Sequence, residues 1–422
     1  MSSFSRRTFL KSATALGVVG ASRSLFPSWM PQLAFAQDGG APGDVLVNVF
    51  LRGGMDGLCA VVPYGEGKDY FDARPTLATP EPGDGGSLDL DGHFALHPAM
   101  APLKELYDEG TFAVVHASGL TDSTRSHFDA MHFMETGKPG DKGASTGWLG
   151  RHLQSAAWQN DSPFRAVGMG AMVAESLRGP VSPLAIKSIA DFHFRGREGE
   201  LQRLQASLAS LYQIDAPTGT LGEQAGLVFE TIEMLNDLSP ESYQPAQGVS
   251  YPDTEFGLGL QQVAQLIKGE VGLEVACVDL GGWDSHNNQG TLDGTFNRLL
   301  GELSSGLHAF YTDLGDKMKD VTVVTMSEFG RRVAENGSQG TDHGHGNAMF
   351  LLGGGTQGGQ VFSDWPSLDP EALVDGDLAI TTDYRDVLAE VVKGRMLNPA
   401  LDKIFPGHSV TPLGLVRSRE NG

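Results

Sequence analysis

The chain has 422 residues, of which 40% are hydrophobic and 19% charged, a composition that predicts a soluble globular protein with a sizeable core. Acidic residues outnumber basic ones by 52 to 30, and the net charge of −22 argues against nucleic acid as a partner because phosphate binding needs a basic surface. The two cysteines exclude a disulfide framework and an all-thiolate metal site. Because no apolar run reaches about 18 residues, no membrane span is expected.

The N-terminal segment has the three parts of an export signal. Arg6 and Arg7 lie in a basic region, a short apolar stretch follows, and the sequence LAFAQ at 33–37 is typical of a cleavage site between small residues. A pair of arginines in this context resembles the twin-arginine translocation signal. We therefore expect residues 1–36 to be a signal peptide that the twin-arginine translocase recognises, and residues 37–422 to form a single periplasmic or secreted domain.

Five nearly continuous apolar runs alternate with helical patterns along the rest of the chain. The runs predict buried strands at residues 44–51, 111–117, 273–280, 321–327 and 348–354. The helical patterns lie at residues 98–109, 127–136, 221–238, 255–268, 291–314 and 383–396. This alternation predicts an α/β domain with a central, mostly parallel sheet sandwiched by helices. The stretch from about 155 to 270 has no strong strand signal and is predicted to be a helical insertion that flanks the sheet.

Ligands of open α/β sheets bind beyond the carboxyl ends of the strands, and polar side chains follow four of the predicted strands. They are Asp56 after the first strand, Arg125, Ser126 and His127 after the second, Asp284 and His286 after the third, and Glu328, Asp342, His343 and His345 after the fourth. Carboxylates and imidazoles without thiolates suit zinc, manganese or a similar divalent ion. The sequence therefore predicts a metal site at one edge of the sheet.

The sequence DHGHG gives the strongest metal signal. Asp342, His343 and His345 place three possible ligands within four positions, and the glycines allow close approach to an ion. The pair Asp284 and His286 is the second signal, since it follows a neighbouring strand. Both segments are predicted to bind metal.

Other residues allow two interpretations. Asp56 lies in a glycine-rich turn, where an aspartate is as often a turn residue as a ligand. Ser126 is followed by Asp129, a spacing that fits a helix cap as well as a nucleophile. His127 is interpreted as a structural residue, and Glu328 as an ion-pair partner of a nearby arginine.

Long motifs extend from about residue 44 to residue 408. They include LRGGMDGL, YFDARPTLA, FALHPAM, TRSHFDA, TGWLGRHL, DLGGWDSHNNQ, TMSEFGRRVAENGSQGTDHGHG and FPGH. Together these motifs resemble the bacterial family called domain of unknown function 1501, which is grouped with the alkaline phosphatases and sulfatases. The resemblance implies the alkaline phosphatase-like fold, with metals at one edge of the central sheet.

The resemblance also implies roles for single residues. Ser126 matches the nucleophile of this clan by its position at a helix start. The residues that match its metal ligands are Asp56, Asp284, His286, Asp342 and His343, with His345 or His408 as the final histidine. The implied cofactor is one or two divalent ions, which would be zinc, manganese or calcium.

The expected function is metal-dependent hydrolysis of a phosphate or sulfate ester, with an anionic small molecule or polysaccharide ester as the substrate. A formylglycine sulfatase needs Cys or Ser followed by x-Pro-x-Arg, and the sequence lacks this pentapeptide, so phosphate esters are preferred. Ser126 would be the nucleophile, and Arg125 would neutralise the anionic group. The alternative is a non-catalytic, metal-stabilised binding protein of the periplasm.

Overall fold

The structure is a computed structural model that describes residues 43–158, 160, 162–189 and 243–419. The predicted export signal and the helical pattern at 221–238 lie outside these residues, so both stay predictions. No helix in the described part of the chain is long and apolar enough to cross a membrane.

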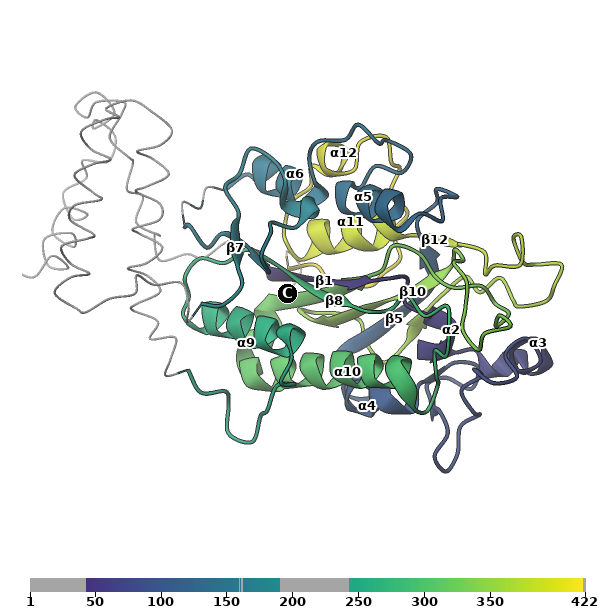
Figure 1. Ribbon diagram of the computed structural model, residues 1–422. Coiled ribbons are helices and arrows are strands. Elements are labelled where there is room, and N and C mark those ends of the chain that lie inside the picture. The colour runs from purple at the N-terminus through teal and green to yellow at the C-terminus, as the bar shows by residue number, and fades with distance from the viewer. Residues whose placement is uncertain (1–42, 159, 161, 190–242, 420–422) are drawn as a thin grey trace, which may run out of the picture.

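The described residues form a nine-stranded sheet through the middle of the molecule (Figure 1). Its strands are β1 (Val45–Arg52), β5 (Phe112–Gly119), β6 (Ala166–Met169), β7 (Leu184–Ile186), β8 (Val275–Gly281), β9 (Val321–Met326), β10 (Asn347–Gly353), β11 (Val361–Phe362) and β12 (Thr382–Asp383). Their order is β11–β5–β10–β9–β1–β8–β6–β7, and β12 also pairs with β5. Among these strands only β10 runs antiparallel to its neighbours, so the predicted mostly parallel sheet is confirmed.

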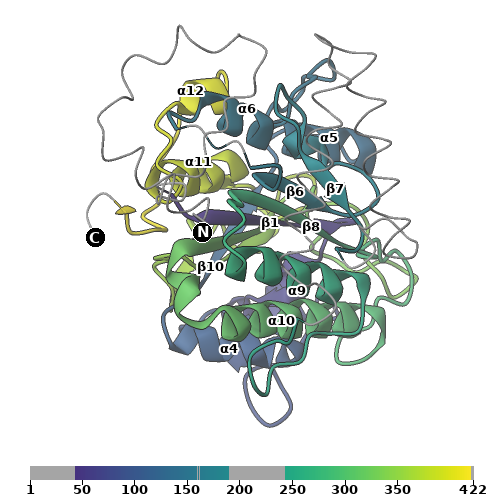
Figure 2. The same ribbon diagram turned by 90° about the vertical axis from the view of Figure 1, so that its left-hand side faces the viewer.

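Helices cover both faces of the sheet, as Figures 1 and 2 show. One face carries α4 (Ala101–Asp108), α9 (Glu255–Lys268) and α10 (Gly294–Leu314). The other carries α5 (His127–Thr136), α6 (Trp148–Ser155), α11 (Tyr384–Gly394) and α12 (Leu401–Ile404). Strand β1 serves both layers, since Val47 and Val49 pack into the first core and Leu46 and Phe50 into the second.

Short elements complete the described chain. They are α2 (Gly57–Ala60), α3 (Lys68–Phe71), a small sheet of β2 (Val61–Val62), β3 (Leu88–Asp89) and β4 (Ala95–Leu96), and the 3-10 helices η2 (Tyr64–Glu66), η3 (Pro98–Met100), η4 (Glu175–Leu177) and η6 (Gly315–Asp320).

The five predicted strands all form, as β1, β5, β8, β9 and β10. Helix α5 has the predicted bounds because Ser126 caps its first turn and Gly137, with a φ of 65°, takes the left-handed conformation that ends it. The stretch from about 155 to 270 differs from the prediction, since β6 and β7 join the main sheet. These strands have only four and three residues, too few for a recognisable apolar run. Residues 190–242 of the insertion predicted at about 155–270 lie outside the described residues, so a helical structure there stays a prediction.

Two buried histidines are held in the neutral form. In His116, Nε2 donates to the Val61 carbonyl at 3.0 Å, and Nδ1 accepts the Ala117 backbone N–H at 2.8 Å. His97 makes the same pattern of one donated and one accepted bond. Burial lowers the pKa of each imidazole from 6.5 to about 4.

We expect the free energy of unfolding to fall as the pH decreases from about 6.5 to about 5. The unfolded chain takes up a proton at each of these histidines near pH 6.5, whereas the folded chain does so only near pH 4, so acid favours the unfolded state. Each histidine contributes a loss of up to about 1.4 kcal/mol per pH unit in this window. Urea unfolding at several pH values measures the slope, which should decrease in a His116→Gln variant. A free energy that is constant over this range would contradict the expectation.

Candidate metal centre

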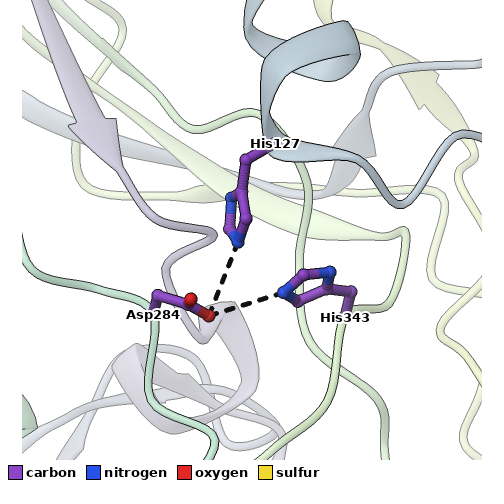
Figure 3. A group of neighbouring side chains, drawn as sticks. All are labelled: His127, Asp284 and His343. Carbon is purple, nitrogen blue, oxygen red and sulfur yellow. Dashed lines mark hydrogen bonds and ion pairs between the residues drawn. The ribbon is translucent and has the colours of Figure 1, made fainter.

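Three polar side chains from different loops meet at one edge of the sheet (Figure 3). Strands β1, β5, β8 and β9 run in the same direction, so the loops that follow them share this edge. His127 begins α5 after β5, Asp284 follows β8, and His343 lies in the loop after β9. One ligand atom of each residue lies within 4.8 Å of the others. The structure thus brings together Asp284 and His343, which the sequence predicts as ligands, with His127.

The Oδ1 atom of Asp284 is the centre of the group. It lies 3.5 Å from Nε2 of His127, 3.4 Å from Nε2 of His343 and 3.1 Å from Nε2 of His286. Burial raises the pKa of the Asp284 carboxyl, but Arg331, which donates to Oδ1 at 2.8 Å, outweighs burial and lowers it. Three imidazole nitrogens therefore surround a charged carboxylate at neutral pH.

The other ring nitrogen of each histidine is fixed by an acceptor oxygen. The Nδ1 atoms donate at 2.7–2.8 Å, from His127 to Oε1 of Glu328, from His286 to Oδ1 of Asp342, and from His343 to the Arg125 carbonyl. Carboxylate and carbonyl oxygens can only accept, so the hydrogen of each neutral ring is on Nδ1. In the neutral form of each ring the Nε2 lone pair therefore faces Asp284; the hydrogen bond to Glu328 raises the pKa of His127.

This arrangement fits a metal ion. The Nε2 atoms of His286 and His343 are 2.9 Å apart, and with both hydrogens on Nδ1 their lone pairs would repel each other. Nε2 of His127 is buried, and no described residue forms a hydrogen bond with it. A cation between Nε2 of His127, Nε2 of His343 and Oδ1 of Asp284 would satisfy these three atoms. Metal-binding histidines usually donate their other ring N–H to a carboxylate or carbonyl, as these three do.

Two buried charged side chains hold the surrounding loops. Glu328 accepts the backbone N–H of Gly53 at 2.8 Å in addition to His127, so it connects the loop after β1 to helix α5. Arg331 donates to the backbone carbonyls of Gly54 and Thr341 at 2.7 and 2.9 Å. The ring of His127 and the carboxylate of Asp284 are therefore each fixed by a buried charged side chain.

Two predicted ligands have other roles. Asp342 is 54% exposed and contacts the group through His286, whose ring it orients. His345 lies apart, since its Nδ1 is 2.9 Å from Oδ2 of the fully buried Asp377, and the bond to Asp377 raises the pKa of His345. This carboxylate also accepts from Arg125, and His345 is therefore part of a cationic cluster that would repel a metal ion.

Asp56 is also outside the metal centre, although the sequence predicts it as a ligand. It caps α2 by accepting the Cys59 backbone N–H at 3.3 Å, and it pairs with Arg74 at 2.6 Å. Gln289 donates to the same carboxylate at 2.8 Å. Burial raises the pKa of Asp56, but the Arg74 guanidinium outweighs it and holds this pKa below its usual value. Both oxygens are thus used by protein donors, and Asp56 is structural.

The predicted catalytic pair lies beside the group. Ser126 is exposed, and its hydroxyl accepts the Asp129 backbone N–H at 3.4 Å as the cap of α5. Within the described residues no carboxylate or imidazole is hydrogen-bonded to this hydroxyl. The Arg125 guanidinium donates to Asp377 at 2.6 Å, so only its backbone carbonyl contacts the centre, through His343.

From sequence alone, His127 is interpreted as structural and Glu328 as an ion-pair partner, whereas the structure places His127 in the group of possible ligands and hydrogen-bonds Glu328 to it. The sequence feature that could have identified both residues is their position just after strands that end at the same edge of the sheet. Glu328 is the second residue after β9, and His127 is the first residue of the helix that follows β5. A charged or imidazole side chain this close to the carboxyl end of a parallel strand lies near the ligand-binding edge.

Comparison with solved structures finds low similarity. A protein of the alkaline phosphatase superfamily from Vibrio parahaemolyticus is 11% identical, with a TM-score of 0.36 over 77% of this chain and 64% of that chain. A protein from Pyrococcus horikoshii is 12% identical, with a TM-score of 0.34 over 87% of this chain and 99% of that chain. A lipoteichoic acid synthase from Listeria monocytogenes is 9% identical, with a TM-score of 0.32 over 82% of this chain and 76% of that chain. The chain thus spans just under two thirds of the Vibrio structure.

The family comparison covers most of the chain. No curated protein matches it. The family model described as Protein of unknown function (DUF1501) matches residues 44–393, from the start of β1 to the end of α11. The chain therefore belongs to this family.

Proposed function

We propose that the protein is a metal-dependent hydrolase of phosphate or sulfate esters, with phosphate esters preferred. One observation carries the proposal: the Nε2 atoms of three histidines converge on a carboxylate oxygen of Asp284. Asp284 is 48% exposed, so an anionic ester can reach the group from solvent. The resemblance of the sequence motifs to the alkaline phosphatase and sulfatase clan supports this reaction class. The missing formylglycine pentapeptide supports phosphate over sulfate.

The donor set favours zinc. Imidazole nitrogens with a carboxylate are usual ligands of zinc and also suit manganese, whereas calcium prefers a shell of oxygen atoms. The described residues contain one group of this kind, so we propose one ion per chain. When bound, the ion would supply positive charge to the ester oxygens and lower the pKa of the attacking hydroxyl or water.

The chain's own residues hold these donors in place before substrate binds. Glu328 fixes the ring of His127, and Arg331 fixes the carboxylate of Asp284. Because Glu328 and Arg331 are buried, neither of these side chains has to move when an ester arrives. Substrates would be small anionic esters or esters of an anionic polysaccharide.

Ester turnover tests the proposal directly. The mature protein, loaded with zinc or manganese, should hydrolyse at least one of three substrate classes, namely aryl phosphates, phosphodiesters and aryl sulfates. Turnover should be lost on chelation and return with the metal. Bound metal without any turnover would instead support a metal-stabilised binding protein and overturn the hydrolase.

Replacement of Ser126 by alanine distinguishes between two roles of this residue, a catalytic nucleophile and a helix cap. Because its hydroxyl contacts the Asp129 backbone and, among the described residues, no base, we expect the free energy of unfolding to fall by about 0.5–2 kcal/mol and turnover to survive. Urea unfolding and initial rates on the same samples measure both effects. Loss of all turnover at unchanged stability and metal content would contradict this and assign the covalent step to Ser126.

We propose further that the twin-arginine translocase exports the protein to the periplasm or the medium. Replacing Arg6 and Arg7 together by lysine should leave an uncleaved precursor in the cytoplasm, because the translocase reads this pair. Cell fractionation and N-terminal sequencing measure the outcome, with the exported wild type beginning at Gln37. A Lys11→Arg variant is the control and should be exported. Normal export of the double variant would refute the assignment.

A further inference from the structure

Two arginines share one buried carboxylate beside the metal centre. Oδ2 of the fully buried Asp377 accepts from Arg125 at 2.6 Å and lies 2.9 Å from Nδ1 of His345. Oδ1 of Asp377 lies 3.4 Å from Nε of Arg332, and the Asp375 carbonyl also accepts from Arg332. Both guanidiniums are therefore fixed from one side by the same turn of the chain.

This cluster has an excess of positive charge and free donors. Two guanidiniums ion-pair with a single carboxylate, Asp377, while Asp342 lies near Arg332 and its pKa is lowered mainly by the hydrogen bond from His286. The side chains of Arg125 and Arg332 are 38% and 37% exposed. Among the described residues, nothing accepts from Nη1 of either arginine. The chain has a net charge of −22, so this cluster is a positively charged patch on an otherwise acidic protein. Such a patch attracts anions from solution.

Backbone hydrogen bonds place the cluster next to the metal centre. The Arg125 carbonyl accepts from His343 at 2.8 Å, and the Arg332 N–H donates to the Asp342 carbonyl at 3.0 Å. The guanidiniums themselves bond to the turn at Asp375 and Asp377 and not to the centre. An anion on the two arginines would therefore be a different group from the one at the metal centre.

We propose that Arg125 and Arg332 form a subsite for a tetrahedral oxyanion, a phosphate or sulfate group that is not the one hydrolysed. Paired guanidinium forks match the oxygens of such a group in charge and in geometry. Asp377 positions both guanidiniums through its two carboxylate oxygens without touching the substrate. The consequence for substrate rests on the proposed function: the ester carries at least two anionic groups, as a polyphosphorylated or polysulfated compound does.

Binding tests the subsite without catalysis. The mature chain is titrated with sodium sulfate in a calorimeter; one saturable site is expected after chelation, and the same site should persist in the metal-loaded form, where the metal can bind sulfate as well. Arg125→Gln and Arg332→Gln should each bind sulfate at least about tenfold more weakly, because each loses charge-assisted hydrogen bonds. Arg178→Gln is the matched control, since Arg178 is 58% exposed and paired with Glu175, and it should bind like the wild type.

Lysine variants guard against a loss of folding. Arg125→Lys and Arg332→Lys keep the charge that pairs with Asp377 but lack the fork, so their sulfate affinity should lie between those of the wild type and the glutamine variants. If the lysine variants fold and bind sulfate no more tightly than the glutamine variants, charge alone is insufficient for binding, which supports the requirement for a guanidinium. Lysine variants with full affinity would show that the fork is unnecessary and overturn the paired-guanidinium geometry.

Kinetics tests the consequence for substrate. An aryl phosphate that also carries a sulfate group on its ring should have a KM at least about tenfold below that of the plain aryl phosphate. The Arg332→Gln variant should raise the KM of this doubly charged substrate by a similar factor. If sulfate binding depends on both arginines but no ester is hydrolysed, the subsite is supported and only the proposed hydrolase function is overturned. Ester turnover with sulfate binding that is absent, or equal in all variants, would overturn the subsite alone.

Discussion

Replacing Asp284 by asparagine is expected to lower the affinity for zinc by at least about 100-fold and to remove ester hydrolysis with it. Among the described residues, Asp284 supplies the only carboxylate oxygen of the metal-binding group. Asparagine keeps the shape of the side chain and can still accept from Arg331, so the fold should survive while the charge is lost. Elemental analysis and competition with a chelator of known affinity measure the change.

Asp279→Asn is the matched control for this experiment. Asp279 lies in β8, five positions before Asp284, and the two side chains are 46% and 48% exposed. Asp279 pairs with Arg52 and contacts no member of the metal centre, so its replacement should leave zinc affinity unchanged. If Asp284→Asn bound zinc as tightly as the wild type, the proposed centre would be wrong.

Replacing Asp56 by alanine is expected to destabilise the fold by about 3–5 kcal/mol without changing the metal content of the folded protein. The substitution leaves Arg74 fully buried without its counter-ion, which is one of the most costly defects in a protein interior. A loss of this size is a large part of the roughly 5–15 kcal/mol that stabilises an ordinary domain. Urea unfolding and elemental analysis of the folded fraction measure the two quantities.

A double variant supplies the control for Asp56. Asp56→Leu combined with Arg74→Met removes both charges and should recover part of the lost stability, because no buried charge then remains unpaired. Recovery is partial, since Arg74 also donates to the backbone carbonyls of Arg332 and Val333. Loss of metal at full stability in Asp56→Ala would reverse the assignment and make Asp56 a ligand.

The sheet could be predicted from sequence because its main strands are buried on both faces. Residues 45–52 and 321–326 are nearly continuous apolar runs, and such runs are typical of parallel strands covered by helices. Strands β6 and β7 escaped prediction because they are short and lie towards one edge of the sheet, where fewer apolar residues are needed. The antiparallel direction of β10 also has no signal in its sequence, since direction is set by the connection before it.

The site was predictable at the level of strand ends but not of single contacts. The carboxyl ends of β8 and β9 correctly indicated Asp284 and His343 as neighbours. Asp56 also follows a strand, yet a buried arginine from 18 positions further along the chain takes its carboxylate. No local sequence pattern predicts the ion pair between Asp56 and Arg74, because it depends on how the loop with Arg74 packs in three dimensions. The same holds for His127, whose ring is aimed by the distant Glu328.

Because β10 runs antiparallel to β9, several polar residues near the candidate site lie in one continuous loop. Strand β9 ends and β10 begins at the same edge of the sheet, so residues 327–346 never cross back over a face. A parallel successor would have needed a crossover connection to return to the opposite edge. This uninterrupted loop carries Glu328, Arg331, Arg332, Asp342, His343 and His345. Exchanging this loop between relatives would therefore replace His343 and Arg332 in one step and leave the strand order unchanged, while His127, Asp284 and Arg125 would stay with the loops that supply them.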